Sequence, residues 1–245
     1  MAEGGFDFKK LLDETKATLI TPAEYFAVMP KEGGFGDPIV KAVIYSFIAG
    51  IFTFLWGALK LTAAAGAFGG MIGGGIGIMG LIWSIIGGII GLFIGGAIVL
   101  VISAICGGNT NYEANVRVTA SLMALSPVSA ILSFLAGFSL WLGGLVSLAV
   151  ALYGLYLLYI AVTKALAGKE GTAKVISIVL AVIPVLMILS TLLCVKAASN
   201  FSDQIMKDIP AQNQEQFKKL SEDFNKALED AKKAAPEGGD KDEEK

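Results

Sequence analysis

The side chains that most often perform acid–base and nucleophilic chemistry are missing from this 245-residue sequence or lie outside its apolar segments. The sequence contains no histidine, which removes Ser-His dyads and triads, the His-Glu-x-x-His metal site and histidine proton relays. Its long apolar segments contain no aspartate or glutamate, so they offer no carboxylates for an intramembrane aspartyl protease or a proton-coupled carrier. We therefore expect no enzyme activity, no catalytic residues, no cofactor and no metal site.

One glycine-rich motif matches a nucleotide-binding pattern without its structural context. Residues 75–80 read Gly-Ile-Gly-Ile-Met-Gly, which is the G-x-G-x-x-G spacing of dinucleotide-binding loops. Such a loop follows a strand, opens a helix and is followed about 20 residues later by an acidic residue. The next acidic residue here is Glu113, which is too far along the chain. We therefore do not interpret this motif as a cofactor site.

Glycines spaced by four residues are better explained by helix packing, because small residues let helix backbones approach closely in a membrane. This spacing occurs in three sets: Gly66, Gly70 and Gly74; Gly69, Gly73 and Gly77; and Gly87, Gly91 and Gly95. We predict that Gly70, Gly74 and the third set pack against neighbouring helices. The helix that carries the third set is expected to form the buried centre of a bundle or, alternatively, the seam of a dimer.

The composition indicates a membrane protein. Hydrophobic residues make up 55% of the chain and charged residues 16%, against about 25% charged residues in soluble domains. No charged side chain occurs between Lys60 and Glu113 or between Arg117 and Lys164, and each stretch can hold about two spans of roughly 20 residues. The predicted fold class is all-α, a polytopic transmembrane helix bundle whose partner is the lipid bilayer. The net charge of −2 gives no basic surface, so we expect no nucleic-acid partner.

Five membrane spans are predicted. They cover residues 38–61, 81–106, 117–136, 143–164 and 175–197. Pro127 and Pro184 lie inside the third and fifth spans and should kink them. Residues 62–80 are uncharged but consist mostly of glycine and alanine, so we expect an outer loop or a re-entrant element there. Cys106 and Cys194 then lie on opposite sides of the bilayer, where we expect small packing residues rather than a disulfide.

The distribution of basic residues predicts the orientation of these spans, because cytoplasmic loops carry more Lys and Arg than outer loops. With the N-terminus in the cytoplasm, the cytoplasmic side receives Lys9, Lys10, Lys16, Lys31, Lys41, Arg117, Lys164, Lys169 and Lys174. The short outer loops receive only Lys60. An extra span in residues 62–80 would move the last three of these lysines to the outside. Five spans also predict that the C-terminus lies outside.

Both terminal regions carry helical patterns. In residues 1–37, expected to be cytoplasmic, residues 6–20 predict an amphipathic helix that lies either on the membrane interface or against the protein's own cytoplasmic side. In residues 198–245, apolar residues recur at helical spacing before an acidic end. We expect a soluble amphipathic helix followed by a disordered tip.

Cap-then-proline patterns predict where two helices begin. Thr21 and Glu24 could form a capping box around Pro22 and start a short helix that ends before Pro30. Asp37-Pro38 repeats the pattern before the first span.

One pair of opposite charges lies between the second and third spans. Glu113 and Arg117 are four residues apart, which suits an ion pair that braces the start of a helix. Alternatively, Arg117 could help to bind a partner or a lipid headgroup.

These features together resemble the Ypt-interacting-protein (Yip) family of five-span membrane proteins, in its bacterial form. The resemblance covers residues 19–195. Its motif residues are Pro22, Ala23, Glu24, Tyr25, Phe26, Met29, Pro30, Gly107, Gly108, Glu113, Arg117, Ser126 and Pro127.

The resemblance implies a multi-pass protein without catalytic residues. Eukaryotic relatives are associated with Rab-type small GTPases and vesicle traffic, but the Asp-Leu-Tyr-Gly-Pro and Gly-Tyr motifs typical of those members are missing here. That difference favours a protein of the bacterial cytoplasmic membrane.

Two functional hypotheses remain. The first is a non-enzymatic scaffold that organises the membrane or binds other membrane proteins, or a second copy of itself. The second is a transporter or channel for a neutral or lipid-like solute, because broken helices often line substrate sites.

Overall fold

The computed structural model describes residues 7–59 and 76–208. Residues up to Ile188 form one compact unit, and residues from Leu189 belong to a second. The described residues form helices and connecting turns, without strands, as the sequence predicts. The residues 62–75 of the predicted outer element, with Gly70 and Gly74, and residues 209–245 of the predicted tail lie outside the described residues.

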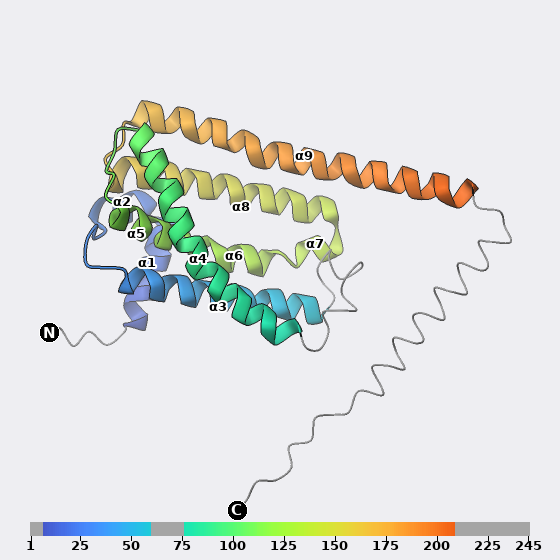
Figure 1. Cartoon of the computed structure of the whole chain (residues 1–245), viewed down its shortest axis with the longest axis horizontal. Helices are drawn as coiled ribbons and strands as arrows, with labels where there is room; N and C mark the ends of the chain where they lie inside the picture. Colours follow the sequence, from blue (N-terminus) through green and yellow to red (C-terminus); the bar gives the residue numbers. More distant parts are fainter. Residues whose placement is uncertain (1–6, 60–75, 209–245) are drawn as a thin grey trace, which may run out of the picture. The chain divides into compact units, whose positions relative to one another are not determined.

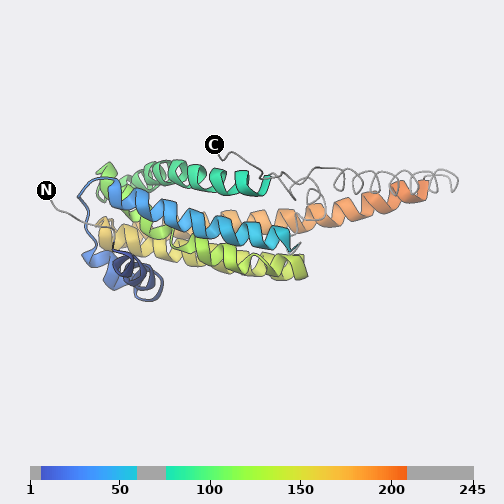
Figure 2. The same ribbon diagram turned by 90° about the horizontal axis from the view of Figure 1, so that it is seen from below.

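Two short helices precede the long ones (Figures 1 and 2). They are α1 (Phe8–Ile20) and α2 (Pro22–Val28). The long helices are α3 (Gly36–Ala58), α4 (Ile76–Ile105), α8 (Leu140–Ile160) and α9 (Glu170–Asp208). Between α4 and α8 lie α5 (Tyr112–Leu122), α6 (Leu125–Leu132) and α7 (Leu135–Phe138), and a π-helical turn, η2 (Ala161–Ala165), extends α8.

Among the residues that the structure describes, five helical segments are long and apolar enough to cross a membrane, as the sequence predicts. They are Gly36–Ala58, Gly80–Ile105, Tyr112–Phe138, Trp141–Ala165 and Glu170–Ser190. Large apolar side chains such as Trp83, Ile94 and Val179 point out of the unit and are more than half exposed, as expected for residues that contact lipid. The predicted division at residue 198 stays a prediction, because α9 continues through that position to Asp208.

The third span is interrupted shortly before Pro127. The amide of Ala124 donates to the carbonyl of Ser121, and the amide of Ser126 donates to the carbonyl of Met123. These bonds reach back three residues, so the chain tightens between α5 and α6. Pro127 has no amide proton and cannot donate to the carbonyl of Met123 four residues earlier. That carbonyl accepts from the amide of Ser126 instead. Pro184 lies inside α9, and the helix continues past it.

The most buried helix of the unit is α5. Every residue from Ala114 to Ser121 is buried, and Asn115 and Arg117 are among them. The glycines of the second span predict instead that this span is the buried centre of the bundle or, alternatively, the seam of a dimer. The first of these alternatives is wrong, because one side of α4 contacts α3 and α5 while its other side exposes Ile90, Ile94 and Ile98.

The glycine contacts of α4 show which side of this helix packs against α3 and α5. A Cβ atom on Gly96 would lie 2.5 Å from Cγ2 of Val116, one on Gly95 would lie 2.7 Å from Cγ2 of Thr119, and one on Gly88 would overlap the side chain of Ser46. A Cβ atom on Gly87 or Gly91 would have nothing within 4 Å. Within the chain, Gly95 therefore lies against α5, whereas a side chain at Gly87 or Gly91 would meet no other helix, and the packing role of these glycines stays a prediction. The residues of α4 that contact the other helices include Gly88, Leu92, Gly96 and Val99. Three of them lie one position after the predicted row of Gly87, Gly91 and Gly95.

Candidate functional site

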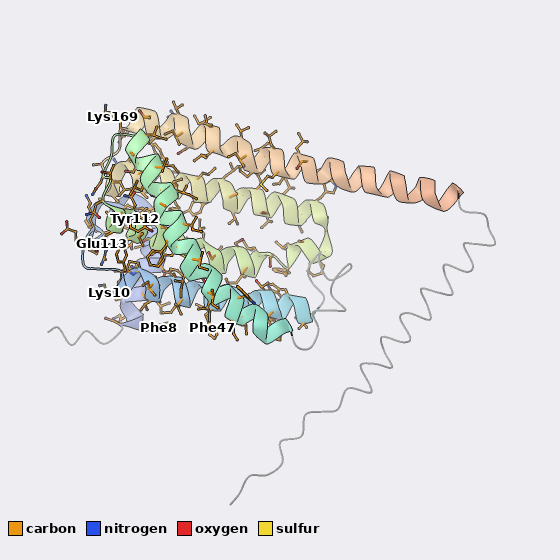
Figure 3. All side chains as sticks on the ribbon, viewed as in Figure 1. Phe8, Lys10, Phe47, Tyr112, Glu113 and Lys169 are labelled. Atoms are coloured by element: carbon orange, nitrogen blue, oxygen red, sulfur yellow. The ribbon has the colours of Figure 1, made fainter. Side chains whose placement is uncertain are left out.

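Many of the charged side chains that the structure describes in this unit lie at one end of the bundle, where α1, α2 and the starts of α3 and α5 meet (Figure 3). Five of them contact one another, and we call them the charge cluster: Glu14, Asp37, Lys41, Glu113 and Arg117. They come from α1, α3 and α5. The cluster therefore joins three segments that are distant in sequence.

Arg117 lies at the centre of the charge cluster, with a side chain that is only 6% exposed. Its Nε donates to Oε1 of Glu113 over 3.1 Å, and its Nη2 donates to the carbonyl oxygen of Gly34 over 2.7 Å. Its Nη1 lies 3.9 Å from Oδ2 of Asp37. The predicted pair with Glu113 therefore forms, and the guanidinium fork also holds the loop before α3.

The loop before α3 can follow this path because glycine occupies two of its positions. Gly33 and Gly34 have φ angles of +127° and +82°, which side-chain-bearing residues rarely adopt. A Cβ atom on Gly33 would also lie 2.8 Å from Nη2 of Arg117. The amide of Gly34 donates to Oε1 of Glu113 over 2.6 Å. Arg117 and Glu113 thus hold both the carbonyl and the amide of Gly34.

Lys41 is the second cation of the charge cluster, and its side chain is 8% exposed. Its Nζ lies 2.6 Å from Oε2 of Glu14 on α1 and 3.2 Å from Oδ2 of Asp37 one turn earlier on α3. In the sequence, Lys41 is evidence only of orientation, and these partners are not predicted. The four-residue spacing of Asp37 and Lys41 is a local signal for one of them, whereas no local signal points to Glu14.

The helix-start predictions around these residues are correct only in part. Pro22 occupies the first turn of α2, but the Thr21 side chain makes no cap bond and Glu24 is exposed. The predicted capping box is therefore wrong. Asp37 is also not a cap, because α3 begins at Gly36 and places Asp37 inside its first turn. There its carboxylate pairs with Lys41 and Arg117 instead.

The motif residues of α2 attach that helix to the bundle. Phe26 is fully buried, and the hydroxyl of Tyr25 lies 2.9 Å from Oγ of Ser121 on α5. Ser126 and Pro127 lie in α6 and make no contact of this kind. Their role is the helix interruption described above.

The Gly107-Gly108 motif brings two loops together at the same end of the bundle. The amide of Asn109 donates to the carbonyl of Leu166 over 2.7 Å, and the amide of Lys169 donates to the carbonyl of Cys106 over 2.9 Å. A Cβ atom on Gly108 would lie 2.7 Å from the carbonyl oxygen of Leu166. A glycine is needed there because the α4–α5 loop and the η2–α9 loop are in backbone contact.

Sequence reasoning also missed a buried polar side chain beside these loops. Asn115 is fully buried, and its Nδ2 donates to the carbonyls of Asn109 and Asn111. Asn111 itself caps α5 by accepting from the amides of Glu113 and Ala114. The sequence signal for this contact is the four-residue spacing of Asn111 and Asn115 at the start of a helix.

This arrangement holds helices together through paired charges. Each cation of the charge cluster faces carboxylates or a carbonyl, so its charge is neutralised in place. Within residues 7–59 and 76–208, no three metal-ligating side chains lie together. Because Glu14 pairs with Lys41, the first two turns of α1 belong to this site together with the motif residues.

Comparison with curated proteins and with solved structures gives no match. The model of the Yip1 domain matches residues 16–192. This range contains α2, the five spanning segments and four of the five members of the charge cluster, all except Glu14. Since the matched range covers well over half of the sequence, the chain belongs to the Yip1-domain family of membrane proteins.

Proposed function

We propose that this protein is a non-enzymatic membrane scaffold that binds other membrane proteins through its N-terminal helices. The observation that supports the proposal is the position of α1 and α2, which are docked on the end of the bundle but keep an apolar outer surface. We call these two helices the platform. Its inner contacts fix it in place, and its outer side chains are available for binding.

The inner side of the platform is attached to several helices. Leu11 and Thr18 of α1 are buried, and Oγ1 of Thr15 lies 2.6 Å from the hydroxyl of Tyr45 on α3. The hydroxyl of Tyr153 on α8 donates to the carbonyl of Leu19. These contacts favour the alternative in which the first helix packs against the protein itself.

The outer side of the platform carries large apolar side chains that the bundle does not cover. Phe8 is 55% exposed, Leu12 53% and Val28 82%. Lys9 and Lys16 are exposed on the same helix as Phe8 and Leu12. Apolar side chains flanked by lysines are typical of a helix at the membrane interface, so a partner that meets this surface would itself lie at the membrane.

The outer surface can be tested without disturbing the docked side. We expect the double substitution Phe8→Ser and Leu12→Ser to abolish in-cell crosslinking to partner proteins, because it removes exposed apolar area and no buried contact. The measurement is crosslinking in cells followed by mass spectrometry of the purified complexes. The matched control, Asp13→Ser with Glu24→Ser, changes two exposed acidic positions of the platform and should keep the partners. An unchanged set of crosslinked proteins in the Phe8/Leu12 variant would count against the platform.

We further propose that the platform faces the cytoplasm of a bacterial cell, with the C-terminus on the opposite side of the membrane. The support is the charge pattern, since the lysines of α1 and of the η2–α9 loop belong to the side that the positive-inside rule assigns to the cytoplasm. Alkaline phosphatase fused after Lys245 should be active, and green fluorescent protein fused there should not fluoresce. The reverse result would contradict the orientation.

The transporter alternative gains nothing from the contacts described above. It depended on residues 62–80, most of which lie outside the described residues, and on Pro127 and Pro184. The interruption beside Pro127 is explained by its missing amide proton and the local turn bonds. We therefore retain the scaffold as the proposed function.

A further inference from the structure

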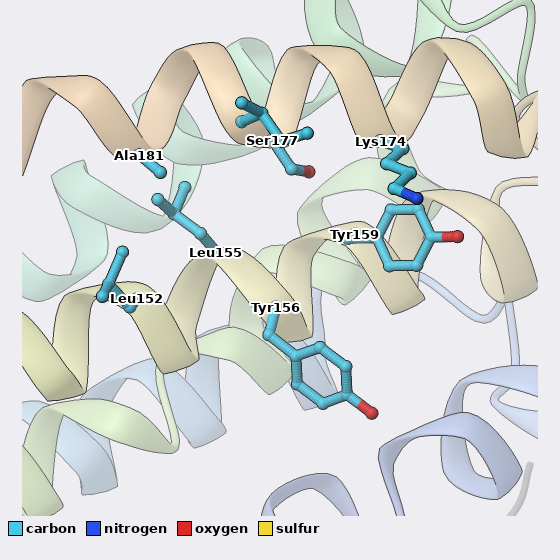
Figure 4. Close-up of a pocket in the computed structure, with 8 residues that line it drawn as sticks. Leu152, Leu155, Tyr156, Tyr159, Lys174, Ser177 and Ala181 are labelled. Carbon is cyan, nitrogen blue, oxygen red and sulfur yellow. The ribbon is translucent and has the colours of Figure 1, made fainter.

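A groove runs between α8 and the part of α9 that belongs to the first unit (Figure 4). Its volume is about 360 Å³. On the α8 side it is lined by Leu152, Leu155, Tyr156 and Tyr159, and on the α9 side mainly by Lys174 and Ile178. The groove is thus apolar along most of its length and polar at one end.

The side chains of the protein leave the walls of this groove uncovered. Only 6% of the most apolar stretch of Glu170–Ser190 is buried, compared with 33% for Tyr112–Phe138. Ile178 is 59% exposed and Tyr156 is 48% exposed. In a bilayer such a space is filled by hydrocarbon, because no water is present at that depth to occupy it.

The polar end of the groove carries a cation. Lys174 and Tyr159 both line this end of the groove (Figure 4), and the ammonium group of Lys174 has no carboxylate within ion-pair distance among the described residues. Lys164, in contrast, is paired with Glu170 over 3.3 Å. An unpaired lysine at the mouth of an apolar groove attracts a negative charge that belongs to an otherwise apolar molecule.

The order of these side chains along the helices matches the order of groups in a phospholipid. Lys174 and Tyr159 lie near the charged end of the bundle, whereas Leu152 lies two turns of α8 away from Tyr159. Seven residues of helix correspond to about 10 Å. A headgroup phosphate at the lysine would therefore place the start of its acyl chain along Leu155 and Ile178, and later carbons at Leu152.

We propose that this groove binds one phospholipid with an anionic headgroup. The ammonium group of Lys174 and the hydroxyl of Tyr159 contact the phosphate, and the apolar walls contact an acyl chain. A second copy of the chain fits less well as the occupant, because an apolar helix would leave Lys174 unpaired. The proposal is independent of the platform and of any protein partner.

The lipid preference can be measured on the full chain. The protein is equilibrated in mixed vesicles of phosphatidylglycerol and phosphatidylcholine with identical acyl chains, released into mild detergent and analysed by native mass spectrometry. We expect one retained lipid with a preference for phosphatidylglycerol, and a fall of about fivefold in that preference in Lys174→Gln, since one lysine near an anionic lipid contributes about 1 kcal/mol. Lys31→Gln, which changes an exposed lysine outside the groove, should keep the preference.

A second variant separates the headgroup contact from the groove itself. Ala181→Trp places a large ring in the groove, whose wall includes Ala181, and should lower retention of both lipids. Equal preference in Lys174→Gln and the unchanged protein would overturn the headgroup assignment. A dimer that dissociates in Ala181→Trp, with no retained lipid in the unchanged protein, would overturn the proposal in favour of a second copy.

Discussion

Replacing Gly96 by leucine is expected to lower the free energy of unfolding by about 3 kcal/mol, the upper end of the usual cost of overpacking. A Cβ atom at Gly96 would lie 2.5 Å from Cγ2 and 3.1 Å from Cα of Val116. Val116 is fully buried in α5, so neither its side chain nor its backbone has space into which to move. The larger side chain must therefore separate α4 from the most buried helix of the unit. The measurement is unfolding in mixed micelles with increasing dodecyl sulfate.

The matched control for this experiment is on the same helix. Gly91→Leu adds the same side chain at a position where a Cβ atom meets nothing within 4 Å, so the unfolding transition of the monomer should not move. Equal losses in both variants would contradict the packing register of α4. The control also tests the predicted dimer seam, because Gly91→Leu should change the oligomeric state in mild detergent only if Gly87 and Gly91 contact a second copy.

Replacing Arg117 by methionine should detach the loop before α3 from α5. Methionine keeps much of the buried volume but loses the donors to Glu113 and to the carbonyl of Gly34, which lie at 3.1 Å and 2.7 Å. We expect a loss of about 2 kcal/mol, in the range for hydrogen bonds to charged groups. The cost stays moderate because the Glu113 side chain is 24% exposed and so reaches water, and because Asp37 keeps Lys41.

Hydrogen exchange and a conservative variant distinguish the Arg117 effect from general destabilisation. In Arg117→Met, the amide of Gly34 should exchange faster because its acceptor Glu113 loses the bond to Arg117 that positions it, while amides in the second half of α8 should keep their protection. Arg117→Lys retains the charge but lacks the planar fork, so it should restore only part of the protection at Gly34. Unchanged exchange of the loop in both variants would show that Arg117 does not hold it.

The sequence is sufficient to predict the helical class and the five spans. Both follow from where charged residues are absent, and that property does not depend on how helices pack. Local patterns failed for the capping box of Thr21 and Glu24, although these residues are one turn apart. They were correct for the pair of Glu113 with Arg117 and for the end of α2 before Pro30. These contacts are determined by helix geometry alone.

The sequence could not predict contacts between distant segments. Two contacts join different helices: the ion pair of Lys41 with Glu14 and the hydrogen bond of Tyr25 with Ser121. The spacing of residues along one helix does not predict contacts between helices. For a similar reason, the sequence could not show which glycines of α4 face the other helices of the bundle. Gly87-Gly88 and Gly95-Gly96 offer two adjacent rows of small residues, and only the partner helices decide which of them is covered.

The attachment of the platform has a consequence for the order in which the chain assembles. Residues 8–28 leave the ribosome before the groups that hold them, because those groups belong to later parts of the chain. Ser121 is 96 residues after Tyr25, and Tyr153 is 134 residues after Leu19. The platform can therefore acquire its final position only after the fourth span has been inserted. A partner that recognises the docked platform would distinguish finished bundles from incomplete ones.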